Sequence, residues 1–215
     1  MRNASLWIGG GLAGVLSICG YLVAILVPWP DTQFGTSGTV LTVSLFPVMG
    51  IIYAYGLRGF IAAERDGAVN TLAFVFAALG FTTLLSMLLA QLSVGAAIAE
   101  TTRGLDDQIA RAIRRGLRLI DLGLDVAWDL LIGTALILWG LAMRRRSGLG
   151  PVWGYPSVGF GVALIVLNGS TFPTPPANAG LFDIGPFIAV FMLALAVRLT
   201  WLGLRARSAA AAPAQ

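Results

Sequence analysis

The chain has 215 residues, of which 57% are hydrophobic and only 11% are charged, and its formal net charge is +4. Soluble domains carry roughly 25% charged residues, so this composition excludes an ordinary water-soluble domain and favours a membrane protein. All 14 basic residues are Arg and the chain has no His, which excludes His-based metal sites, haem ligation by His and His general bases. Cys19 is the single cysteine, so the chain has neither an intrachain disulfide nor a CxxC redox pair.

Six continuous apolar stretches follow one another along the chain, and each is long enough to cross a bilayer as an α-helix. A hydrocarbon core about 30 Å thick requires roughly 20 helical residues. Because these stretches do not alternate between polar and apolar residues, they favour helices over the strands of a membrane barrel. We therefore predict an all-α fold, a polytopic membrane helical bundle, with transmembrane helices over residues 6–27, 39–57, 71–94, 122–143, 152–172 and 181–203.

The distribution of Arg predicts how the bundle is oriented, because short Arg-rich loops resist translocation across the membrane. With six spans, the side that holds both termini carries Arg2, Arg58, Arg65, Arg144, Arg145, Arg146, Arg205 and Arg207. The conflicting segment is the loop over residues 100–121, whose five Arg are nearly balanced by Glu100, Asp106, Asp107 and Asp121. We predict that both termini are cytoplasmic, with one transmembrane domain over residues 1–207 and a disordered tail over residues 208–215.

The segment over residues 105–120 has its own periodic pattern. Apolar residues recur at steps of three and four, and Arg residues occupy the positions between them. This pattern predicts an amphipathic helix between the third and fourth transmembrane helices. We expect it to lie in the bilayer interface or to cap the outer mouth of the bundle.

Two glycine pairs have the GxxxG spacing that lets helix backbones approach closely in a bilayer. Gly10 and Gly14 lie in the first apolar stretch, and Gly150 and Gly154 lie where the fifth begins. The spacing is typical of packing within the chain and also of a homodimer formed through Gly-rich helix faces. The sequence leaves both alternatives open.

An acidic column is the most unusual feature of the apolar segments. Asp121, Asp125 and Asp129 are spaced by four, so on one helix they share a face and succeed one another by about 6 Å along the axis. An ionised Asp at the bilayer centre costs roughly 2.5 to 3.5 kcal/mol, so such residues usually face the bundle interior, a wet cavity or a partner. The column therefore requires either a structural or a functional explanation.

The functional explanation predicts an outward-facing acidic cavity, because other polar residues also lie near the outer ends of the predicted helices. The candidate ligand-binding or ion-binding residues are Asp125, Asp129, Asp121, Asn168, Asp183 and Glu100. Several carboxylates in one cavity would attract cations or protonated amines. The structural explanation assigns the same acids to hydrogen bonds and ion pairs between helices. Neither explanation predicts a cofactor or a metal site.

Enzymatic alternatives require patterns that the chain does not complete. CDP-alcohol phosphotransferases share the D-x3-D-x3-D spacing, but the sequence from Asp107 to Arg111 lacks the Gly that follows the first Asp of their motif. Intramembrane aspartyl proteases use GxGD, whereas residues 122–125 read LGLD. We therefore expect no enzymatic activity.

The block over residues 128–168 carries a resemblance to known proteins. It joins a helix, the turn sequence RRRSGLGPVWG over residues 144–154 and a Gly-rich following helix. In this it resembles a family of small bacterial multi-pass membrane proteins of unknown function. The resemblance implies a helical bundle in the bacterial plasma (inner) membrane and transfers no catalytic residues.

These observations together lead to one functional hypothesis and one alternative. We expect a non-enzymatic membrane protein that binds or passes a small cationic or lipidic ligand through the outward acidic cavity. The alternative is a structural or accessory membrane subunit with neither ligand nor catalysis. The expected surroundings are the lipid bilayer, and no nucleic acid is expected as a partner.

Overall fold

The structure is a computed structural model that describes residues 2–26, 35–64, 67–101 and 106–211. Over these residues it is built from helices, without strands: α1 (Arg2–Leu26), α2 (Gly35–Ala62), α3 (Ala68–Thr101), α4 (Asp107–Met143), α5 (Pro151–Thr171), the short 3-10 helix η1 (Pro176–Ala179) and α6 (Gly185–Ala211). Six of the helices are long and apolar enough to cross a membrane. The predicted all-α fold with six candidate membrane spans is thus confirmed.

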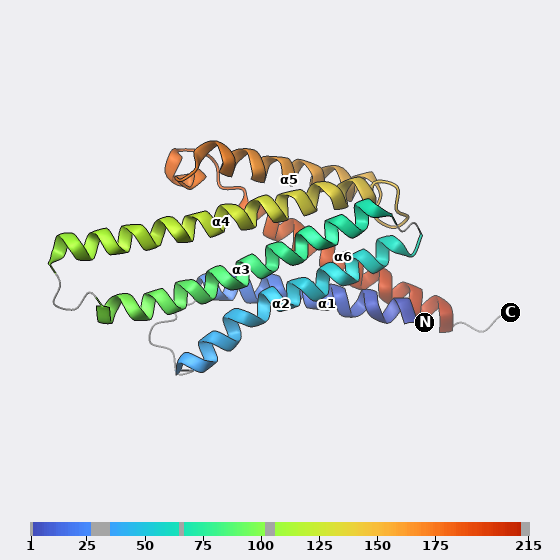
Figure 1. Cartoon of the computed structure of the whole chain (residues 1–215). Helices are drawn as coiled ribbons and strands as arrows, with labels where there is room; N and C mark the ends of the chain where they lie inside the picture. Colours follow the sequence, from blue (N-terminus) through green and yellow to red (C-terminus); the bar gives the residue numbers. More distant parts are fainter. Residues whose placement is uncertain (1, 27–34, 65–66, 102–105, 212–215) are drawn as a thin grey trace.

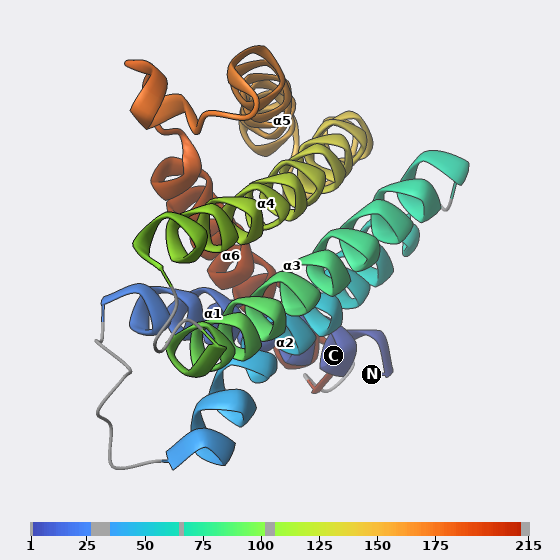
Figure 2. The ribbon, with the colours of Figure 1, turned by 60° about the vertical axis from the view of Figure 1, so that its left-hand side comes forward.

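Successive long helices run in opposite directions, so the two termini lie at the same end of the bundle (Figure 1). The packing order is α5, α4, α3, α2, α1, α6, in which each helix packs against the next. Figure 2 shows α5 at the outside of this arrangement, beside α4. Between α5 and α6, Phe191 lies 5.9 Å from Trp153 and 5.2 Å from Phe160, measured between ring centroids.

The interior is filled by large side chains from α2, α4 and α6. Tyr53, Leu57, Leu136, Trp139 and Leu195 are almost completely buried. Many large apolar side chains on the outside of the bundle are exposed, including several on α5 and α6. Such a surface would promote aggregation in water, but it suits a lipid environment.

Glycines set the close approach of α4 to α5. A Cβ atom on Gly140 would lie 2.6 Å from the carbonyl oxygen of Gly154, and one on Gly133 would lie 3.0 Å from that of Gly161. These positions are seven residues apart on each helix, so the backbones meet twice along the antiparallel pair. Ser157 adds a hydrogen bond from its hydroxyl to the Leu136 carbonyl oxygen, 2.7 Å away.

The GxxxG pairs noted in the sequence take part in packing within the chain. A Cβ atom on Gly10 would lie 2.6 Å from Gly56 Cα, and one on Gly14 would lie 2.7 Å from the Tyr53 ring. Gly154 faces Gly140, whereas Gly150 precedes α5 with a φ of +68°, a backbone conformation that favours glycine. The homodimer through these faces stays a prediction.

The α3–α4 pair extends well beyond the other helices at the end opposite the termini (Figure 1). α3 has 34 residues and α4 has 37, which correspond to about 50 and 55 Å, against a hydrocarbon core of about 30 Å. The amphipathic segment was predicted as a separate helix, but its described part forms the first turns of α4 without a break. Asp106 caps this helix by accepting a hydrogen bond from the Gln108 amide at 2.8 Å.

At the other end of the chain, α6 continues to Ala211. Residues 208–211 were predicted to belong to the disordered tail, yet they are helical, as their Ala-rich sequence favours. Residues 212–215 lie outside the described residues.

A buried arginine fastens the α4–α5 turn to α2. Arg146 is 8% exposed, donates from Nε to the Phe60 carbonyl oxygen at 2.9 Å and forms an ion pair with Glu64. Arg198 of α6 donates two hydrogen bonds, of 3.1 and 2.9 Å, to the carbonyl oxygen of Gly148 in the same turn. The turn thereby joins α2, α4, α5 and α6 at the end of the bundle that holds the termini.

The glycine contacts predict a large difference between two similar substitutions. Gly140→Ala would force α4 and α5 apart and should lower the free energy of unfolding by roughly 1–3 kcal/mol, as expected for overpacking. Gly159→Ala on α5 is the control, because a Cβ there meets nothing within 4 Å. Unfolding by sodium dodecyl sulfate in mixed micelles measures both, and equal stability of the two variants would contradict the proposed packing.

Candidate acidic binding site

The acidic column lies on α4 as the spacing predicted, and it runs from the α3 contact into the bundle. Asp121 is partly exposed and accepts a hydrogen bond of 2.8 Å from Nε2 of Gln91 on α3. Asp125 is also partly exposed, whereas Asp129 is only 5% exposed. The column therefore begins at a partnered carboxylate and ends at a buried one.

Asp125 and Asp129 face further polar groups from other parts of the chain. Asp129 interacts electrostatically with Asp125 and with Asp183, which precedes α6. Tyr21 of α1 interacts with these three carboxylates. Its ring packs against Phe46 of α2, with the centroids 5.8 Å apart and the planes inclined by 61°. We call Tyr21, Asp125, Asp129 and Asp183 the acidic group.

The unusual member of this group is Asp129. Within the described part of the chain, its carboxylate has neither a hydrogen bond nor an ion pair, and its electrostatic neighbours are other acids. A buried carboxylate without a partner costs several kcal/mol in its charged form. The structure thus surrounds Asp129 with groups that favour the arrival of a positive charge or a proton.

Asp183 also has a contact outside the acidic group, and Asn168 and Glu100 are the two predicted residues still to be placed. Asp183 is exposed, and its Oδ1 accepts a hydrogen bond of 2.9 Å from the amide of Gly185, at the start of α6. Asn168 is buried on α5 and donates to the Leu164 carbonyl oxygen of its own helix at 3.1 Å. The side chain of Glu100 lies outside the described residues. Asn168 and Glu100 are therefore not placed in the acidic group by any described contact.

A cavity of about 260 Å³ opens between α3 and α4 around Asp121. Its described lining includes Gln91, Arg114 and Arg118 beside Asp121, so the charges there are mixed. Asp125 and Asp129 are not among these lining residues. The cavity is thus a mixed-charge groove at Asp121, and the four residues of the acidic group lie outside its described lining.

Sequence reasoning missed Tyr21. The signal available was a tyrosine near the outer end of the first apolar stretch, which is also the ordinary place for a tyrosine at a membrane boundary. Among the described residues, no three His, Cys, Asp or Glu side chains are arranged to hold a metal ion.

Comparisons of the chain with protein-family models, curated proteins and solved structures find no match. Over the residues that the structure describes, the chain is an all-helical protein with six candidate membrane spans, and among those residues the Asp129 carboxyl group has neither a hydrogen-bond nor an ion-pair partner.

The surroundings of Asp129 predict that its charge lowers stability. Where the carboxyl group is ionised, Asp129→Asn removes the repulsion from Asp125 and Asp183, so the free energy of unfolding at alkaline pH should rise by roughly 1–3 kcal/mol. Asp107→Asn, an exposed change at the start of α4, removes the same charge and should leave stability unchanged or slightly lower. Unfolding in mixed micelles measures both variants. A clearly less stable Asp129→Asn variant would show that the carboxylate holds the helices together.

Proposed function

We propose that the protein binds, or passes across the membrane, a small cationic ligand at the acidic group formed by Tyr21, Asp125, Asp129 and Asp183. The observation that carries this proposal is the buried carboxylate of Asp129, which has no hydrogen-bond or ion-pair partner among the described residues. A permanently partnered acid would need no ligand. An unpartnered acid beside two other carboxylates gains most from a positive charge that can enter and leave.

Tyr21 favours a particular class of cation. An aromatic ring beside carboxylates suits a protonated amine, because the ring face attracts the ammonium group while the carboxylates accept its hydrogen bonds. The electrostatic interaction of Tyr21 with three acids supports this pairing. A free amine and the amine headgroup of a lipid share this chemistry, so both are candidate ligands.

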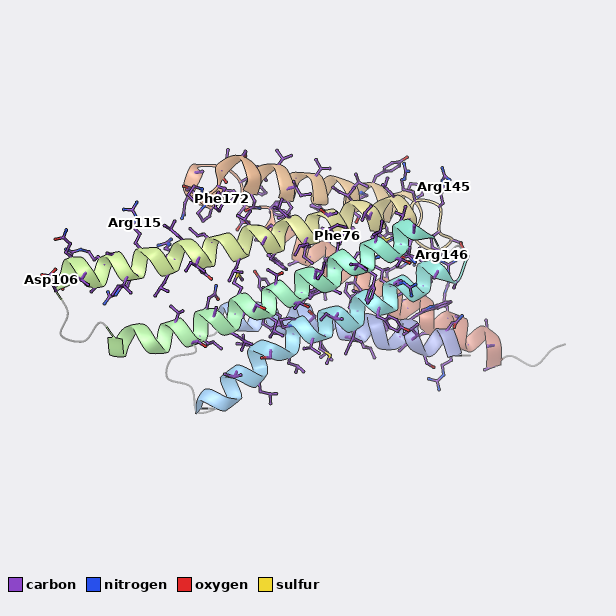
Figure 3. All side chains as sticks on the ribbon, viewed as in Figure 1. Phe76, Asp106, Arg115, Arg145, Arg146 and Phe172 are labelled. Atoms are coloured by element: carbon purple, nitrogen blue, oxygen red, sulfur yellow. The ribbon has the colours of Figure 1, made fainter. Side chains whose placement is uncertain are left out.

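The proposed location is the bacterial plasma membrane, with both termini cytoplasmic and the acidic group towards the outer side. Arg residues support this orientation, since eight of the 12 described Arg residues belong to the end with the termini or to the spans beside it. Figure 3 shows Arg145 and Arg146 at that end, and Asp106 and Arg115 at the opposite end. A cation arriving from outside would then meet the α3–α4 extension first.

The second candidate function is a structural or accessory subunit without a ligand. Two acids favour it, because Asp121 is bonded to Gln91 and Asp183 to the start of α6. These contacts give both acids a role in holding helices. Asp129 has no such role among the described contacts, and its behaviour separates the two candidates.

Ligand binding predicts a shift in stability that depends on Asp129. The wild-type protein in detergent should be stabilised by at least one member of a panel of Na⁺, K⁺, alkylamines and amine lipids. The gain reaches about 2.7 kcal/mol at one hundred times the dissociation constant. Asp129→Asn should lose this shift and Asp107→Asn should keep it, because only the first change touches the acidic group. If no ligand stabilises the wild type and Asp129→Asn is also less stable, the structural candidate is correct.

The orientation predicts opposite labelling of two single-cysteine variants. In a Cys19→Ala background, Arg115→Cys should react with a membrane-impermeant maleimide added outside intact cells. Arg145→Cys should react only after the membrane is opened. Both positions are exposed, which makes them a matched pair. The reverse pattern would place the termini outside.

A further inference from the structure

A second cavity lies at the opposite end of the bundle from the acidic group. It has a volume of about 390 Å³ and lies where α2 ends, α3 begins and α4 ends. Its charged lining residues are Glu64, Arg144, Arg145 and Arg146, and its polar lining residue within α3 is Asn70. Figure 3 marks Arg145 and Arg146 at this end of the bundle. We call this space the arginine cavity.

The described lining of the arginine cavity carries an excess of positive charge. Arg146 forms an ion pair with Glu64, so these two charges offset each other. Arg145 is exposed and has no ion pair among the described residues. Arg144 has a buried Nε without a hydrogen-bond partner in the described part of the chain, and its guanidinium lies 5.7 Å from the centroid of the Tyr155 ring. Two positive charges therefore remain for an anion.

The start of α3 adds hydrogen-bond donors to the same cavity. Ala68 and Val69, the first residues of α3, line it, and their amides precede those of Asn70 and Thr71, which donate to the Gly67 carbonyl oxygen. The positive end of the helix dipole also favours an anion there. Arginines from one helix end and amides from another thus surround one space, which is the arrangement that binds phosphate groups.

Asn70 indicates what else the ligand carries. Its side chain is 2% exposed, and its Nδ2 donates to the Arg58 carbonyl oxygen at 3.0 Å. Its Oδ1 is buried and has no partner among the described residues. An oxygen in this position accepts a hydrogen bond, so a ligand hydroxyl group beside the phosphate would satisfy it.

The position of the cavity indicates that the phosphate belongs to a lipid. Candidate spans Val43–Ala62, Ala68–Val94 and Asp107–Met143 all end or begin beside it, so it lies at a membrane boundary. Val69 and Leu141 line it and are 41% and 39% exposed, which leaves apolar surface for acyl chains. Basic cavities between helices at the cytoplasmic side are typical sites for anionic headgroups.

We infer that the arginine cavity binds the headgroup of an anionic phospholipid that carries hydroxyl groups, of the phosphatidylglycerol type. Arg144, Arg145 and the first amides of α3 hold the phosphate, and Asn70 accepts a hydrogen bond from the headgroup hydroxyl. This site is separate from the acidic group and does not depend on the function proposed for it.

The test compares lipid binding by the full chain and three variants. Native mass spectrometry and thermal unfolding in detergent are measured with phosphatidylglycerol, phosphatidylcholine and soluble glycerol phosphate. Wild type should retain phosphatidylglycerol in preference to phosphatidylcholine. Arg144→Gln and Arg145→Gln should each weaken this binding by roughly fivefold, the effect of one basic residue near an anionic lipid surface. Arg115→Gln is the matched control, since it removes an exposed Arg of α4 at the other end of the bundle and should leave binding unchanged.

Arg145 keeps the test decisive if Arg144→Gln fails to fold, because its side chain is exposed and holds no described contact. Equal binding of phosphatidylglycerol and phosphatidylcholine would overturn the inference. The inference would also be overturned if Arg145→Gln weakened phosphatidylglycerol binding no more than Arg115→Gln does. Stabilisation by glycerol phosphate equal to that by the lipid would also overturn it, since the ligand would then be a free phosphate ester.

Discussion

Inside a bilayer every polar group between helices needs a partner from the protein, since no water is there to provide one, and the whole arrangement depends on this constraint. Ser17 has such a partner, because its hydroxyl donates to the Phe46 carbonyl oxygen, and the Ser157 hydroxyl likewise donates to the Leu136 carbonyl oxygen. Near the membrane boundary, Arg146 forms an ion pair with Glu64 and donates a hydrogen bond to the Phe60 carbonyl oxygen. Asp129 has no such partner within the described chain, and its ionisable carboxyl group distinguishes it from neutral buried groups that also lack one, such as the Tyr53 hydroxyl and the Trp139 indole.

Asp129 lies in line with two glycines of α4. Asp129, Gly133 and Gly140 are separated by four and seven residues, so they share one face of the helix. Close contacts at Gly133 and Gly140 bring this face against α5. Asp129 therefore lies at the outer end of the row of small residues along which the two backbones meet. One face of α4 thus carries both the close helix contact and the innermost acid of the column.

Much of this architecture could be predicted because apolar runs of about 20 residues have few alternatives to spanning a membrane. The α3–α4 extension could not be predicted. The amphipathic spacing of the segment after Asp107 suits two structures equally well, a separate interfacial helix and the first turns of α4. Four-residue spacing identified Asp125 and Asp129, whereas Tyr21 joins them only through the packing of α1. The arginine cavity could not be predicted, because the orientation of the bundle in the membrane already explained why Arg144 to Arg146 lie at a helix end.

α4 connects the two charged sites and also keeps them apart. Fifteen residues separate Asp129 from Arg144, which is about 22 Å along a straight helix. This distance is well beyond the roughly 7–10 Å within which two substitutions usually influence each other. Changes at sites that share no contacts are usually additive. A cation at the outer end and an anionic headgroup at the inner end can therefore bind independently, and a substitution at one end reports on that end alone.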